Sequence, residues 1–177
     1  LVGITGKDTE AEILRGLVSE NPLVECRLVK LDNRDTTVKT RIVAHNQHVV
    51  RLDQETTESI DATESESVIT EISAAISQSD AVIISDYAKG MLNDDVIAAI
   101  FRLAKIDEKM VIVDPKSTDF TKYAEAAVIT PNLKEALAAM SFSGDSTANV
   151  DRLKAEIRSV LGLKSVLITE GEHGMTL

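Results

Sequence analysis

Residues 81–90 read AVIISDYAKG, a short apolar run that ends abruptly in polar and charged residues. The same pattern returns at residues 110–116 (MVIVDPK), 127–135 (AVITPNLKE) and 165–174 (SVLITEGEHG). Short, continuous apolar runs are typical of strands that are buried on both faces of a parallel sheet. These four stretches therefore predict strands at residues 81–85, 110–113, 127–129 and 165–169.

Amphipathic segments separate the predicted strands. We expect helices over residues 67–77, from Asn93 to Leu103, from Asn132 to Ala139 and from Asn149 to Leu161. Alternating strands and helices indicate an α/β domain, with a mainly parallel sheet and helices on both faces.

The first third of the chain adds a helix, a strand and a hairpin. Asp8 is placed to cap a helix that runs to about Glu20, and a strand is expected at residues 24–29, with Cys26 in the core. Residues 36–52 are β-branched and alternating, with a break at residues 44–47, which predicts a two-stranded hairpin apart from the main sheet. Residues 53–67 are expected to be a solvated connection. The predicted division is residues 1–35 (α/β core), 36–53 (a small β lid) and 54–177 (α/β core with the nucleotide-binding side).

Composition restricts the partners and the compartment. Lys+Arg 19 against Asp+Glu 29 gives a formal net charge of −10, which disfavours nucleic acid and anionic membranes as partners. With a single cysteine, Cys26, no internal disulfide can form, and a reducing cytoplasmic location is expected. A phosphorylated ligand would need local basic residues or helix N-termini to offset the overall charge.

The polar residues that follow the four strands suggest a ligand site. Ligands of open α/β sheets bind beyond the carboxyl ends of the strands. Lys89 and Lys116 would supply cationic donors, Asn132 and Glu135 would orient a hydrated metal ion, and Gly171 would let backbone approach phosphate. Each feature also has a simpler reading as a helix cap, a solvated charge or a turn. The chain carries no P-loop motif, no Gly-x-Gly-x-x-Gly and no Gly-x-Ser-x-Gly.

The segment Asn132-Leu133-Lys134-Glu135, preceded by Thr130-Pro131, resembles the Asn-x-x-Glu motif of ribokinase-like carbohydrate kinases. A narrower similarity is to the bacterial kinases of heptose 7-phosphate that form one domain of a bifunctional enzyme with ADP-heptose synthase activity. It rests on an ordered set that spans nearly the whole chain: TVKTR at 37–41, Gln47 with RLD at 51–53, SDYAKG at 85–90, DPK at 114–116, DFTKY at 119–123 and GEHGM at 171–175.

The resemblance implies a large α/β domain with a small β lid, and an ATP- and Mg²⁺-dependent transfer to the C1 hydroxyl of the heptose, a step toward lipopolysaccharide core sugars. It also implies a homodimer formed through the lid. It assigns Asn132, Glu135, Thr169 and Gly171 to the nucleotide, with Glu135 reaching Mg²⁺ through water, and Lys116, a cationic donor at the strand ends, is predicted to bind with them. It assigns Lys39, Arg41, Gln47 and Arg51 to the sugar phosphate, and Asp86 and Lys89, which follow the strand at residues 81–85, are predicted to bind with them.

Three features depart from the family pattern. The family's glycine-rich sugar-binding segment and its Gly-Ala-Gly-Asp motif, whose aspartate is the catalytic base, are absent from residues 1–177. The chain is therefore expected to be a fragment of a larger domain, to lack a catalytic residue of its own and to be inactive alone. Glu170 also stands where relatives often carry a basic residue, which would weaken the attraction for a nucleotide unless its side chain points away.

Two other functions remain open from the sequence. Another ribokinase-like sugar or nucleoside kinase would share the same motifs, because sugar identity depends on the lid and on the absent segment. A non-catalytic α/β binding module would keep the scaffold without the chemistry.

Overall fold

The computed structural model describes residues 1–45, 47–116, 118–140 and 150–177, which form two compact units. The first unit contains Leu1–Ala75 and Lys89–Asn93, and the second contains Ile76–Ala88 and Asp94–Leu177. In the described residues, no helix is both long enough and apolar enough to span a membrane.

The first unit begins with a β-α-β motif. Strand β1 (Val2–Thr5) pairs in parallel with β2 (Arg27–Lys30), and helix α1 (Thr9–Ser19) connects them. The Asp8 carboxylate caps α1 by accepting a hydrogen bond from the Ala11 amide at 2.8 Å, as predicted.

The second strand starts later than the sequence suggests. The amides of Leu23 and Val24 both donate to Asn21, so a turn occupies the start of the stretch predicted as a strand. Leu23 is consequently 92% exposed. Cys26 precedes β2 and is only half-buried, so the expectation of a core thiol is wrong.

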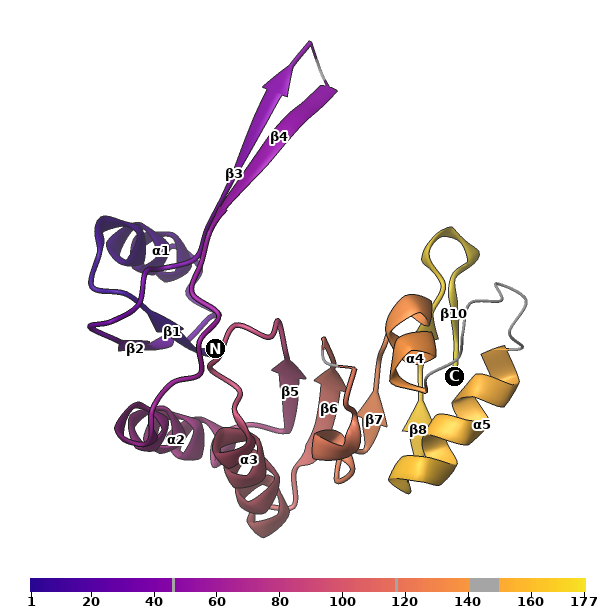
Figure 1. Ribbon diagram of the computed structural model, residues 1–177. Helices are drawn as coiled ribbons and strands as arrows, with labels where there is room; N and C mark the ends of the chain where they lie inside the picture. The colour runs from indigo at the N-terminus through magenta and orange to yellow at the C-terminus, as the bar shows by residue number, and fades with distance from the viewer. Residues whose placement is uncertain (46, 117, 141–149) are drawn as a thin grey trace. The chain divides into compact units, whose positions relative to one another are not determined.

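A long β-hairpin follows, as predicted. Strand β3 (Val38–Ala44) pairs antiparallel with β4 (Gln47–Gln54), with a bulge between Ile42 and Val43. Figure 1 shows the two strands as an extended ribbon that forms its own two-stranded sheet.

The connection after the hairpin is shorter than expected, because helix α2 (Ala62–Ile76) begins well before residue 67. The Asp61 carboxylate accepts from the Glu64 amide at 2.8 Å, and the Glu64 carboxylate accepts from the Asp61 amide at 2.9 Å. This reciprocal capping box starts the helix inside an acidic, Ser/Thr-rich stretch, where composition alone suggested solvated chain.

The second unit contains a four-stranded parallel sheet, which confirms the predicted α/β class. The strands β5 (Ala81–Ser85), β6 (Met110–Asp114), β7 (Val128–Ile129) and β8 (Ser165–Val166) lie in this order. Their arrows point the same way in Figure 1. Helices α3 (Asp94–Ile106), α4 (Leu133–Ala139) and α5 (Val150–Leu161) and the 3₁₀ turn η1 (Thr121–Tyr123) accompany them. Buried Ile97, Ile100, Val111 and Val113 belong to its core, whereas Ile83 and Met110 are exposed among the described residues.

The strand predicted at residues 165–169 is two strands. Only β8 joins the parallel sheet, while β9 (Ile168–Thr169) pairs antiparallel with β10 (Met175–Thr176) across the turn η2 (Gly171–His173). Pro131, which follows β7, has no N–H to continue the parallel ladder, although its carbonyl still accepts from the Thr169 amide at 3.0 Å. Asn149, the predicted cap of α5, lies outside the described residues.

Candidate functional site

The carboxyl ends of the parallel strands bring several predicted site residues to one edge of the second unit. Ser85 pairs with Asp114 across β5 and β6, so Asp86 and Asp114 both stand at this edge. An isolated parallel bridge joins Asn132 to Thr169 beyond β7. Lys89 belongs to the first unit and is described with it.

Asn132 and Glu135 hold each other at the start of α4. The Glu135 amide donates to Asn132 Oδ1 at 3.0 Å, and the Asn132 amide donates to Glu135 Oε2 at 3.0 Å. Their spacing therefore has a structural reason, because a reciprocal capping box satisfies two amides that the helix leaves free. Their proposed contact with a nucleotide remains a prediction.

The second oxygen of Glu135 contacts Lys116. Lys116 Nζ lies 2.9 Å from Glu135 Oε1, and this hydrogen bond and the charge of Glu135 raise the pKa of Lys116. The lysine side chain is 57% exposed and the glutamate side chain 15%. A cation from the loop after β6 is thus anchored over the first turn of α4 while it remains accessible.

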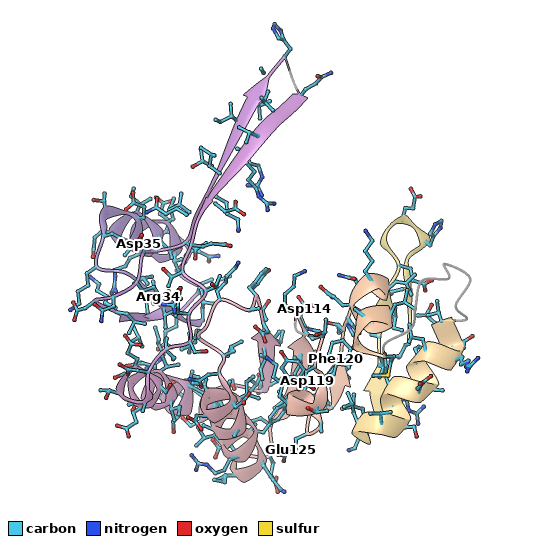
Figure 2. All side chains as sticks on the ribbon, viewed as in Figure 1. Arg34, Asp35, Asp114, Asp119, Phe120 and Glu125 are labelled. Atoms are coloured by element: carbon cyan, nitrogen blue, oxygen red, sulfur yellow. The ribbon has the colours of Figure 1, made fainter. Side chains whose placement is uncertain are left out.

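Asp114 is a third member of this edge, and it was not among the predicted binding residues. Burial, followed by the negative charge of Glu135, raises the pKa of Asp114 above its ordinary value, although Thr130 and Lys116 act in the opposite direction. The Thr130 hydroxyl lies 3.5 Å from Asp114 Oδ1. Figure 2 labels Asp114 at the end of β6. We name Asp114, Lys116, Asn132 and Glu135 the edge cluster.

The edge cluster suits a cation that arrives with its own anionic ligand. Among the described residues, no group of three or more His, Cys, Asp or Glu side chains is placed to enclose a metal ion. Magnesium that accompanies a nucleotide keeps several waters and uses one or two protein carboxylates together with the phosphates. Asp114 and Glu135 supply two carboxylates. The pKa of Asp114 is raised because Thr130 and Lys116 do not fully offset the effects of burial and of the charge of Glu135 on the ionised carboxylate.

Thr169 and Gly171 lie beside this edge. Thr169 ends β9, next to Asn132 through the parallel bridge, and Gly171 has φ +63 with no atom within 4 Å of the position that a Cβ would take. The Glu170 carboxylate accepts a hydrogen bond from the Thr176 hydroxyl, so it is held within the β9–β10 hairpin. That carboxylate therefore has a protein partner.

Asp86 has partners that the sequence did not suggest. It is only 5% exposed; its Oδ1 accepts from the Ala88 amide at 2.7 Å, and its Oδ2 accepts from Lys122 Nζ at 3.0 Å and from the Tyr123 hydroxyl. Burial alone would raise the pKa of Asp86, but these donors outweigh it and lower the pKa. Both carboxylate oxygens are engaged within the protein, so Asp86 holds the loop after β5, and its contact with the substrate stays a prediction.

A second charged group lies in the first unit, at the base of the hairpin. Lys39 Nζ lies 3.1 Å from Asp53 and 3.0 Å from Glu55, and Lys89 Nζ lies 2.5 Å from the other Glu55 oxygen. Arg51 Nε contacts Asp53 at 2.9 Å. We name these five residues the hairpin-base cluster. It brings together three of the residues predicted to bind the sugar phosphate: Lys39, Arg51 and Lys89.

The hairpin has one charged and one apolar face. Residues directly opposite each other on paired strands share a face, and Lys39 is opposite Asp53 while Arg41 is opposite Arg51. The alternate pairs lie on the other face: Thr40 opposite Leu52, and Ile42 opposite Val50. Gln47 lies opposite Ala44, next to the turn. Of the predicted sugar-phosphate residues on the hairpin, only Gln47 lies away from this run of charged pairs.

Comparison with known proteins places the whole chain in one family. The model of the pfkB family of carbohydrate kinases matches residues 1–177. The chain is 39% identical to the bifunctional protein HldE of Gluconacetobacter diazotrophicus over 177 residues, and 34% identical to the HldE of Helicobacter pylori over 176 residues. It spans 37% and 38% of the length of these relatives, and 100% and 99% of itself.

Solved structures share its fold. Phosphofructokinase-2 from Escherichia coli superposes with a TM-score of 0.77 at 16% identity, over 98% of this chain and 56% of that one. Ribokinase from Giardia lamblia superposes with a TM-score of 0.74 at 18% identity, over 98% of this chain and 53% of that one. At these sequence identities the likeness to solved structures shows only the fold. The family is assigned by the match of the family model to all 177 residues. The chain belongs to the pfkB family of carbohydrate kinases.

Proposed function

We propose that this chain is part of an ATP-dependent sugar kinase that phosphorylates heptose 7-phosphate at C1, a reaction on the way to ADP-heptose. The family match and the likeness of the whole of this chain to part of the HldE proteins support a carbohydrate kinase, and the ordered motifs from TVKTR to GEHGM support this substrate. The structural observation that carries the proposal is the Lys116–Glu135 pair beside Asp114 at the strand ends.

The edge cluster is the proposed nucleotide side. Lys116 would contact a phosphate oxygen, and Asp114 and Glu135 would hold the waters of the magnesium ion. When bound, Mg²⁺ neutralises charge on the phosphates. Thr169 and Gly171 would line the nucleotide, and no atom lies within 4 Å of the position that a Cβ of Gly171 would take.

The charged face of the hairpin is the proposed sugar-phosphate side. Arg41 and Arg51 face each other across the two strands, and like charges in this position destabilise a hairpin unless an anion lies between them. The ammonium groups of Lys39 and Lys89 both contact the Glu55 carboxylate. A bound phosphate would accept hydrogen bonds from these same ammonium groups. Lys39, Arg41, Arg51 and Lys89 outnumber the two carboxylates that they contact, Asp53 and Glu55, so this part of the first unit would be locally positive despite the net charge of −10.

Phosphoryl transfer also needs a base for the attacking hydroxyl. None of the described residues is proposed for this role, so we propose that residues 1–177 alone are inactive. Assays therefore use the complete protein that carries this segment.

The decisive experiment separates helix capping from catalysis. Glu135→Gln keeps a side chain able to complete the capping box but removes the charge, and Asn132→Ser keeps a good N-cap but removes the amide. Each variant should lower kcat with heptose 7-phosphate by about ten- to a thousandfold and leave Tm within a few degrees of wild type. Glu64→Gln is the matched control, because Glu64 has the same place in the capping box of α2, and its kcat should not change.

The outcomes separate the competing functions. Wild-type kcat in both variants would reduce the edge cluster to a helix cap. Turnover of another sugar or a nucleoside, with heptose 7-phosphate ignored, would keep the kinase and overturn the substrate. If titration calorimetry detects binding of neither ATP·Mg nor heptose 7-phosphate to the complete protein, the kinase proposal fails and the non-catalytic α/β module is the function left to test.

We further propose that a second copy covers the apolar face of the hairpin. Ile42, Val50 and Leu52 are between 42% and 55% exposed, and they lie on the face opposite the charged residues. The double variant Ile42→Ser, Val50→Ser should shift the protein from dimer to monomer in light scattering. Leu23→Ser, which changes an exposed leucine outside the hairpin, should leave the mass unchanged. A wild-type monomer would contradict the proposal.

A further inference from the structure

Arg34 binds three backbone carbonyls from two separate segments. Its Nη1 donates to the Thr56 carbonyl at 3.0 Å and to the Lys89 carbonyl at 2.8 Å, and its Nη2 donates to the Glu58 carbonyl. Figure 2 shows Arg34 in the segment that leads into β3. One side chain thus joins the chain before the hairpin, the chain after it and the loop that carries Lys89.

The shape of the guanidinium explains the choice of residue. Its planar fork presents five donors in fixed directions, whereas a lysine ammonium is a single point on a flexible stem. In the described part of the chain Arg34 forms no ion pair with a carboxylate, and its three hydrogen bonds all go to backbone carbonyls. The residue is therefore suited to fixing backbone rather than to neutralising an acid.

The two segments that Arg34 joins are already in close backbone contact. The Ile60 amide donates to the Gly90 carbonyl at 3.0 Å. Gly90 has φ +78, and a Cβ there would lie 1.8 Å from the Glu58 carbonyl oxygen. Because this approach leaves no room for a side chain, a small movement of either segment would displace Lys89.

Lys89 is held at both ends by residues next to the hairpin. Arg34 binds its carbonyl, and Glu55, which directly follows β4, binds its ammonium group. We infer that Arg34 is a positioning residue: it keeps Lys89 and the hairpin base in the arrangement that binds the phosphate of the sugar substrate, without touching that substrate. This inference rests on the proposed function and adds the residue that organises its sugar-phosphate side.

The test compares Arg34→Ala and Arg34→Lys in the complete protein. Both variants should raise KM for heptose 7-phosphate by about ten- to a hundredfold and leave KM for ATP within about twofold, because the edge cluster is untouched. Arg34→Lys should not restore the wild-type KM, because lysine lacks the planar guanidinium that binds several carbonyls at once. A low, non-denaturing concentration of guanidinium should partly restore KM in Arg34→Ala. Hydrogen exchange, followed by mass spectrometry, should accelerate in peptides that cover residues 56–60 and 89–91.

Asn93→Ala is the matched control. Asn93 joins the same junction by donating to the Ile60 carbonyl at 3.3 Å and to the Ser65 hydroxyl at 3.0 Å, and neither contact involves Lys89. This variant should lower Tm and speed exchange near residues 60–65 without changing KM for the sugar phosphate.

Two results would separate the failures. If the wild-type protein turns over heptose 7-phosphate and Arg34→Ala speeds exchange without raising KM for the sugar, Arg34 is merely structural and the inference is overturned. If the wild-type protein shows no sugar kinase activity, the proposed function itself fails, whatever the variants do.

Discussion

Tyr123 donates its hydroxyl hydrogen to the carboxylate of Asp86, and both side chains are buried. The two residues are far apart in sequence, and the contact joins the loop after β5 to the 3₁₀ turn η1, which follows β6. Lys122, the neighbour of Tyr123, contacts the same oxygen at 3.0 Å. The contact fixes one corner of the edge at which the nucleotide is proposed to bind.

Tyr123→Phe removes only the hydroxyl, and we expect it to lower the free energy of unfolding by about 1–3 kcal/mol, because it takes a donor from a buried carboxylate. Chemical denaturation measures this loss. Tyr87→Phe makes the same change on a side chain that is 65% exposed, and it should alter stability by less than about 0.5 kcal/mol. Equal effects of the two changes would mean that the Asp86–Tyr123 contact adds nothing.

Asp86 should also contribute to acid sensitivity. Its pKa is lowered from an ordinary value of 3.8, so the ionised form is favoured in the folded state. That stabilisation is complete above the unfolded-state value and disappears as pH falls through the lower, folded-state pKa. Asp86→Asn should therefore be less stable than wild type at neutral pH, and it should lose less stability on acidification. Thermal unfolding across a pH series measures this, and parallel curves for the two proteins would contradict it.

Asp114→Asn should have the opposite effect at neutral pH. The ionised carboxylate is disfavoured by burial and by Glu135, so its removal should raise Tm in buffer free of magnesium and nucleotide. Turnover should fall, because a carboxylate of the proposed nucleotide side is lost. Asp94→Asn is the contrast: Asp94 lies in the first turn of α3, where negative charge is favourable, so its loss should lower Tm slightly. A lower Tm for Asp114→Asn would overturn this view of the edge cluster.

Gly90→Ala should destabilise the protein more than Gly162→Ala does. Both glycines have positive φ, +78 and +65, which costs an alanine about 1–2 kcal/mol. At Gly90 the added Cβ would also meet the Glu58 carbonyl at 1.8 Å, whereas at Gly162 it would meet no atom within 4 Å. Denaturation of the two variants gives the difference. Equal losses of unfolding free energy in the two variants would show that the backbone near Glu58 moves aside at little cost.

Local patterns predicted much of the fold. The strand at Ala81–Ser85 was predicted with its full bounds, and the helices capped by Asp8 and Asn132 begin where expected. These elements depend on apolar runs and on side chains that bind their own backbone a few residues away, so short windows of sequence are enough. The start of α2 was missed because Asp61 and Glu64, which have the same capping geometry, sit in a stretch whose composition suggested a loop.

Site residues were harder to predict, because their surroundings depend on distant segments. Lys39 and Lys89 were predicted to bind the sugar phosphate, and the structure shows that both also contact Glu55. Asp114 was recognised as a polar strand end, but its pKa is raised by burial and by the charge of Glu135, which belongs to helix α4. No local pattern records such neighbours.

The sequence by itself determined the class of the sheet and the edge at which polar residues gather, because parallel strands of one chain necessarily end on the same side. Only the tertiary structure decided which of those residues have partners. Asp86 is enclosed by Lys122 and Tyr123, Arg34 reaches the carbonyls of Thr56 and Lys89, and Arg41 faces Arg51. Such contacts follow from the paths of loops and from hairpin register, which many distant interactions set together.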